Sequence, residues 1–146
     1  MHELQFLILT VIVLALLFDF INGFHDTANA IATSVSTRAI KPAHAIIMAA
    51  ALNFLGAIYS TGVAKTIGGD IVASAEMVDE HIIIAALMGS IVWNLFTWYV
   101  AMPSSSSHAL VGGIIGAVLV STGSTGLNFI GIGKIVLSLI ASPLLA

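Results

Sequence analysis

A short polar run interrupts an apolar segment near the start of the chain. Leu4 to Phe18 is almost wholly apolar, and five polar side chains then follow within eleven residues: Asp19, Asn22, His25, Asp26 and Asn29. A charged side chain near the bilayer centre costs roughly 3 kcal/mol on insertion scales. Such residues are expected to face a cavity, an ion or one another, so this run is the first candidate functional site.

The chemistry of the first run points to a cation. Asp26, Asn22 and Asn29 offer carboxylate and amide oxygens, which hard cations prefer as ligands, and a carboxylate at this depth can also carry a proton. An anion alone would be repelled by Asp26, whereas an anion accompanied by Na⁺, H⁺ or a divalent metal would not. His25 could carry a proton or contact a metal, or it could simply pack. The structural alternative is that Asp26 caps a helix and the amides bond neighbouring helices.

A second polar run, Ser104 to Ser107, follows Pro103 and precedes His108. Proline cannot continue the hydrogen-bond ladder of a preceding helix, so this run predicts the start of a new one. Serine hydroxyls and free N–H groups near Ala109 would then form an anion site at a helix N-terminus. Neither polar run contains Lys or Arg, so neutral donors and bound cations would have to hold an oxyanion. The alternative is a serine-rich loop exposed to water.

Composition places the chain in the membrane. It is 59% apolar and 8% charged, against about 25% charged residues in soluble domains. At about 20 residues per span, the 146 residues have room for five or six spans. Four Lys and Arg argue against nucleic acid binding, and the absence of Cys excludes disulfides and thiolate metal sites.

The hydropathy pattern predicts an all-α membrane protein with interrupted helices. Basic Arg38 and Lys41 share one short turn, which predicts a cytoplasmic location for that turn and an outside location for the N-terminus and the acidic loop. The expected segments in chain order are a helix over 4–21, a break over 22–26, a helical piece over 27–38, a span over 43–64, a polar solvated loop over 65–80, a span over 81–102, an apolar stretch up to 120, a turn over 121–126 and a last apolar segment over 127–146.

Two broken helices that direct their ends at a shared site are typical of secondary transporters. Gly23-Phe24-His25-Asp26-Thr27-Ala28-Asn29-Ala30 closely resembles the signature of the Pit family of inorganic phosphate transporters. The run 103–108 resembles the second signature of that family, and Trp93 to Tyr99 is similar to the sequence just before it. The match covers nearly the whole chain, in the order of the family's N-terminal half.

The resemblance implies a cell-membrane transporter that imports phosphate with H⁺ or Na⁺ and needs no cofactor. It implies that Asp26 and Asn29 coordinate ion and substrate, with Na⁺ as a candidate metal there, and that Asn22 and His25 assist. It also implies that Ser104, Ser105, Ser106 and Ser107 contact phosphate at the tip of a re-entrant helical hairpin. Many members have Asn at the position of His25; the His form resembles bacterial members that use protons and accept metal–phosphate complexes.

The chain departs from the family in length. Members carry a second, inverted half with its own copies of both signatures, and residues 1–146 would form one transmembrane domain, a single repeat. The resemblance therefore implies a partner, either a second half or another copy of this chain.

Two other classes of function are considered beside the transporter. An ion channel would need a continuous pore, and a structural membrane subunit would need no pore. Two broken helices that meet at one depth suggest a closed site instead. An intramembrane hydrolase could use Asp26, His108 and one serine, but the sequence has no nucleophile-elbow pattern. We therefore expect a transporter and not an enzyme.

Overall fold

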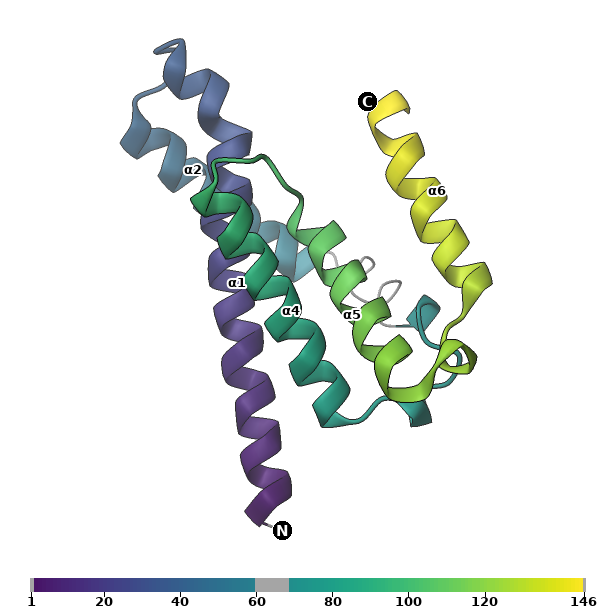
Figure 1. The fold of residues 1–146 in the computed structure, drawn as a ribbon. Helices are drawn as coiled ribbons and strands as arrows, with labels where there is room; N and C mark the ends of the chain where they lie inside the picture. The colour runs from purple at the N-terminus through teal and green to yellow at the C-terminus, as the bar shows by residue number, and fades with distance from the viewer. Residues whose placement is uncertain (1, 60–68, 146) are drawn as a thin grey trace.

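The computed structural model describes residues 2–59 and 69–145 and is built from helices (Figure 1). Three of them, α1, α2 and α4, are long and apolar enough to cross a membrane, and α5 and α6 are shorter apolar helices. This confirms the prediction of an all-α membrane protein. The elements in order are α1 (His2–Ser36), α2 (Pro42–Tyr59), the 3₁₀ turn η1 (Ala75–Met77), α4 (Glu80–Tyr99), α5 (Ser106–Thr122), the 3₁₀ turn η2 (Ser124–Gly126) and α6 (Phe129–Leu145).

The predicted break over 22–26 is wrong, because α1 continues without interruption from His2 to Ser36. The helix contains no proline, and its single Gly23 costs only about 1 kcal/mol relative to Ala. An unbroken helix satisfies its own backbone groups, which is decisive in lipid. At 1.5 Å per residue its 35 residues extend about 52 Å, against about 30 Å of hydrocarbon. Asp26 therefore lies inside a helix and caps none.

The second predicted break is confirmed. α4 ends at Tyr99, α5 begins at Ser106, and the two helices form an antiparallel hairpin whose tip lies beside the C-terminal half of α1 (Figure 1). Asp79 caps the start of α4, where its Oδ1 accepts from the N–H of Ile82 at 2.9 Å. Both α1 and α5 pack against α4, so α4 fixes the position of the hairpin tip relative to α1.

Two apolar clusters hold this arrangement together. Phe18 and Ile21 of α1 pack with Leu87 and Ile91 of α4, and Leu110 of α5 joins them. The second cluster lies toward the other end of the hairpin and includes Ile71, Val72, Ile82, Val111, Val118, Leu127 and Ile135. Each cluster buries apolar side chains from three or more segments of the chain against one another.

The expected solvated loop over 65–80 is only partly correct in its described residues, 69–80. Glu76 and Asp79 are exposed, as expected, but Ile71 and Val72 are buried. Val72 forms an isolated antiparallel bridge with Leu127, which ties this segment to the turn before α6. Residues 65–68 of that loop, and 60–64 of the span expected over 43–64, lie outside the described residues.

The short connection between α1 and α2 has the expected place and composition. Pro42 begins α2, where its missing N–H is tolerated. Arg38 and Lys41 are both exposed in the connection. Arg38 has φ of 59°, a left-handed conformation that ends α1 sharply.

Candidate binding site

The continuous α1 arranges its polar residues along one face. Asp19, Asn22, Asp26 and Asn29 recur at intervals of three and four residues, so they form one stripe on the helix. Phe18, Ile21 and His25 form the neighbouring stripe, and all three are buried. The helix thus presents a polar stripe directly beside the apolar stripe that packs against α4.

One hydrogen bond joins this polar stripe to the serine hairpin. Ser106 Oγ donates to Asp26 Oδ1 at 3.3 Å, between residues 80 positions apart in the sequence. His25 Nδ1 lies 3.5 Å from the same carboxylate oxygen. Ser106 and His25 are 1% and 6% exposed, whereas the Asp26 side chain is 44% exposed. The carboxylate is therefore partly exposed at the edge of a buried layer.

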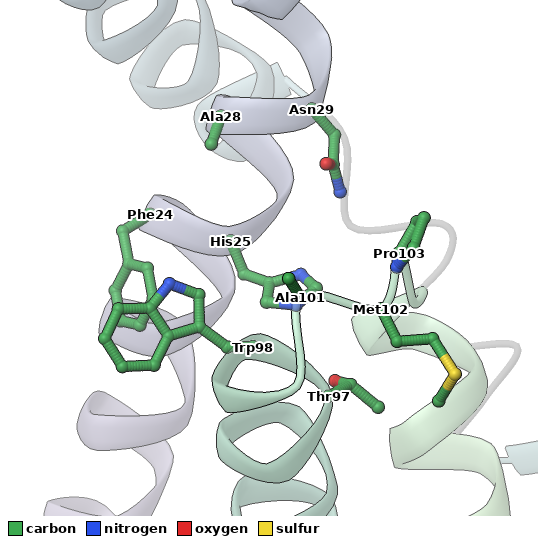
Figure 2. A pocket seen from close by; sticks show the side chains of 9 residues that line it. All are labelled: Phe24, His25, Ala28, Asn29, Thr97, Trp98, Ala101, Met102 and Pro103. Atoms are coloured by element: carbon green, nitrogen blue, oxygen red, sulfur yellow. The ribbon is translucent and has the colours of Figure 1, made fainter.

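A cavity of about 200 Å³ adjoins this pair, lined by residues of α1 and by the end of α4 with its following connection. Figure 2 shows His25 at its centre, Phe24 and Trp98 on one side, and Asn29 with Pro103 on the other. The rings of Phe24 and Trp98 meet edge to face, with centroids 5.8 Å apart. Among the residues that the structure describes, no Lys or Arg lines the cavity. An edge-to-face aromatic pair thus closes one side, and the Asn29 amide and the His25 imidazole also line the cavity.

The N-terminus of α5 leaves backbone donors free beside Asp26. Ser105 is the N-cap, and its hydroxyl accepts from the N–H of His108 at 3.4 Å. The expectation that N–H groups near Ala109 are free is wrong, because the N–H of Ala109 already bonds the Ser105 carbonyl within the helix. Within the described ranges, the N–H groups of Ser106 and Ser107 have no partner. These two donors, with the helix dipole, can attract an anion.

The connection between α4 and α5 is held in a left-handed turn at Ala101, where φ is 53°. The N–H of Ala101 bonds the carbonyl of Trp98, and the N–H of Met102 bonds that of Thr97. This is the Schellman pattern of a helix C-terminus, in which glycine usually occupies the left-handed position. At the other end of the connection, Trp93 Nε1 donates to Ser104 Oγ at 3.2 Å. The serine tip is therefore fixed by hydrogen bonds at both ends.

The structure brings together some predicted site residues and not others. Asp26, His25 and Ser106 are in contact, and Asn29 lines the adjoining cavity. Ser104 and Ser105 serve the hairpin itself, while Ser107 is exposed. The Asn22 side chain makes no hydrogen bond within the part of the chain that the structure describes. The polar groups of this site are one carboxylate, amides, hydroxyls and one imidazole. No three His, Asp or Glu side chains of the described residues lie close enough together to hold a metal ion.

Sequence reasoning missed two groups at the site. Thr97 and Met102 line the cavity, but each reads as an ordinary residue of an apolar span. The polar stripe of α1 was also missed, although its signal was present: the spacing of Asp19, Asn22, Asp26 and Asn29 is helical.

Comparison with known proteins decides the family. The model of the phosphate transporter family matches residues 22–146, which is most of the chain. This chain belongs to the phosphate transporter family. A probable low-affinity inorganic phosphate transporter of Bacillus subtilis (strain 168) is 55% identical over all of this chain and 44% of its own length. The low-affinity inorganic phosphate transporter PitA of Escherichia coli (strain K12) is 39% identical over 94% of this chain and 30% of its own length.

The fold agrees with a solved member of this group. A structure described as the sodium-dependent phosphate transporter superposes with a TM-score of 0.87 at 34% identity, over 94% of this chain and 35% of that one. The chain therefore spans less than half the length of these phosphate transporters. Members of the phosphate transporter family are not enzymes, so the hydrolase alternative is set aside.

Proposed function

We propose that this chain forms part of a secondary active transporter that imports inorganic phosphate together with a cation. The observation that carries the proposal is the hydrogen bond from Ser106 to Asp26. It joins the two polar segments that the sequence singled out, and it supports a site in which the N-terminus of α5 binds the anion and the Asp26 carboxylate binds the cation. The names of the relatives, all phosphate transporters, supply the substrate class.

In this proposal the two sides of the site bind ions of opposite charge. Phosphate oxygens accept from the free N–H groups of α5 and from the serine hydroxyls of 104–107. Asp26 and Asn29 supply oxygens to the cation, and Asn22 is placed one turn before Asp26 on the same polar stripe. His25 lies close enough to Asp26 to exchange a proton with it through small movements.

Charge explains why the two ions would bind together. Two like unit charges 4 Å apart repel by about 4 kcal/mol at an effective dielectric constant of 20. A phosphate ion beside an ionised Asp26 meets a repulsion of this order, and no Lys or Arg in the described parts of the chain lines the cavity to offset it. A cation on Asp26 removes the repulsion, so each ion raises the affinity for the other. This mutual dependence is the thermodynamic basis of coupled transport.

The coupling cation is H⁺ or Na⁺, and His25 favours H⁺. Its Nδ1 lies 3.5 Å from Asp26 Oδ1 without a hydrogen bond, and a small movement of either side chain would let the two groups share a proton. The solved relative is described as sodium-dependent, which supports Na⁺. Uptake that survives replacement of Na⁺ by choline but falls with a protonophore would assign H⁺, and the reverse would assign Na⁺. Stimulation of uptake by divalent metal would indicate a metal–phosphate complex as the substrate.

We further propose that the turn between α1 and α2 faces the cytoplasm of the cell membrane and that the N-terminus is outside. Exposed Arg38 and Lys41 support this orientation. The native chain has no Cys, so single cysteines can report it. A membrane-impermeant maleimide should label Glu76→Cys in intact cells but leave Thr37→Cys unlabelled until the cells are opened. The opposite labelling pattern would invert the proposed topology.

The described helices are proposed to act as one repeat of a larger transporter. The relatives are more than twice as long as this chain, so a second half or another copy of the chain would complete the pathway. Co-expression of a separate second half, or cross-linking between tagged copies, distinguishes these arrangements.

The test of the proposed function is uptake of labelled phosphate by a host that lacks its own phosphate transporters. The protein is compared with Asp26→Asn and with Glu76→Gln, a matched carboxylate-to-amide change in an exposed segment. We expect uptake to fall at least about tenfold in Asp26→Asn, because the hydrogen-bonded ion site loses its charge, and to be unchanged in Glu76→Gln. Equal uptake by all three proteins, with membrane insertion confirmed, would reject the role of Asp26.

A further inference from the structure

Asn94 on α4 is a buried amide without a partner. Its residue is 0% exposed, and neither Oδ1 nor Nδ2 makes a hydrogen bond within the described parts of the chain. Buried polar groups in folded proteins nearly always have such a partner. A fully buried amide whose two polar atoms are both unpaired within the described residues is therefore a candidate ligand-binding group.

Helical register places Asn94 beside the site. Ile21, Ile91 and Leu110 pack together in one apolar cluster of α1, α4 and α5. α1 and α4 run in the same direction and α5 runs back, so one turn toward the hairpin tip leads from these residues to His25, Asn94 and Ser106 (Figure 1).

All three members of this polar layer are at least nine-tenths buried. His25 Nδ1 is the other buried side-chain atom of the described residues that lacks a hydrogen bond. The buried side-chain atoms without a hydrogen bond in the described residues thus all belong to His25 and Asn94 of this layer, and Ser106 of the same layer bonds Asp26 Oδ1. A packing defect would not be expected to coincide with the site in this way.

The charge of the layer favours a cation as the occupant. Asp26 Oδ1 receives one neutral hydroxyl donor and lies 3.5 Å from an imidazole nitrogen. An amide oxygen is a good ligand for a hard cation, and the amide nitrogen of the same group remains free to donate to an anionic oxygen.

We propose that Asn94 is a further ligand-binding residue, whose Oδ1 binds the coupling cation at the buried end of the site. This inference rests on the proposed function and names a residue that the two signature runs do not contain. The cation is Na⁺ or a proton carried by water, since both present positive charge to the amide oxygen.

The test replaces Asn94 by leucine in the complete protein, purified into nanodiscs. Leucine has the same branched shape and number of side-chain heavy atoms but no polar atoms, so it removes an unpaired amide from the protein without bound ions. We expect the melting temperature without phosphate and Na⁺ to be equal or higher, and the apparent affinity for the cation to be at least about tenfold weaker. If the amide were purely structural, Asn94→Leu would lower the melting temperature and would not specifically weaken cation affinity.

The matched control is Asn53→Leu on α2. Asn53 is exposed and its Nδ2 donates to Ala49 O at 3.0 Å, so the same chemical change occurs where the amide is partnered. Cation affinity is measured as a shift in melting temperature in two arms. In the first arm the Na⁺ concentration is varied at fixed pH, with choline as the balancing ion. In the second arm the pH is varied in the absence of Na⁺. Loss of the response in the first arm assigns Na⁺, and loss in the second assigns the proton.

The outcomes separate this inference from the proposed function. If the native protein binds and transports phosphate while Asn94→Leu retains cation affinity within about twofold in both arms, Asn94 is not a ligand. If Asn94→Leu melts at a lower temperature in the empty state, the amide is partnered there and the inference also fails. If the native protein neither binds nor transports phosphate, the proposed function fails and the inference fails with it.

Discussion

The close approach of α4 and α5 at Gly113 makes a quantitative prediction. A Cβ atom on Gly113 would lie 2.5 Å from the backbone oxygen of Ala86 and 2.5 Å from Ser90 Oγ. Ordinary contact begins at 3.4 Å, so α5 must move about 0.9 Å to admit a methyl group. Ser90 Oγ also donates to Ala109 O at 3.1 Å, and the same movement would lengthen this bond beyond hydrogen-bonding distance.

The expected size of the effect follows from two opposing terms. Overpacking of this kind costs about 1–3 kcal/mol, and alanine regains at most about 1 kcal/mol of helix propensity. Gly112 is the matched control, because a Cβ atom there meets nothing within 4 Å. We expect Gly113→Ala to be about 2 kcal/mol less stable than Gly112→Ala.

The assay is the free energy of unfolding in mixed micelles, measured by SDS titration and followed by circular dichroism. Phosphate binding is measured on the same samples. A displaced α5 carries Ser106 away from Asp26, so Gly113→Ala should also bind phosphate more weakly than Gly112→Ala. Equal stability of the two variants would refute the close packing of α4 on α5, and with it our account of how the hairpin tip is positioned.

Two further stability predictions concern helix ends. Ala101→Gly should stabilise the protein by up to about 1 kcal/mol, because Ala101 has φ of 53° and glycine adopts this conformation without strain; unchanged or lower thermal stability would contradict the left-handed turn. Asp79→Ala should destabilise by about 1 kcal/mol, since it removes the cap on the N–H of Ile82, whereas Glu76→Ala in the same segment should have little effect. Equal melting of these two variants would argue against the cap.

The sequence was a good guide where local signals act alone. Pro103 and the capping serine at position 105 define the hairpin tip, and Pro42 marks the start of α2, because these residues limit the backbone whatever surrounds them. Asp26, a candidate site residue from the first polar run, contacts Ser106 and His25 in the structure. The sequence predicts that Asp26 lies in a break between two helices, whereas in the structure it projects from the side of a continuous helix and accepts a hydrogen bond from Ser106.

The remaining features depend on contacts between distant segments. The burial of Ile71 and Val72 requires Leu127, more than fifty residues later, and hydropathy alone assigned their segment to solvent. The break in α1 was inferred from polarity, although the helical spacing of the polar residues argued for continuity. The sequence predicts an ordinary interhelical amide at Asn94, and what distinguishes it is the lack of a hydrogen-bond partner among the described residues.

The central claim is that Ser106 on the phosphate side and Asp26 on the cation side belong to one site. Equilibrium binding of labelled phosphate to the purified protein tests this claim most directly. Ser106→Ala removes the hydroxyl that joins hairpin and stripe, and Ser124→Ala is the control on an exposed turn. We expect Ser106→Ala to bind phosphate about 10- to 100-fold more weakly, the range for a hydrogen bond to a charged group, and Ser124→Ala to bind as the native protein does. Native affinity in Ser106→Ala would contradict the claim.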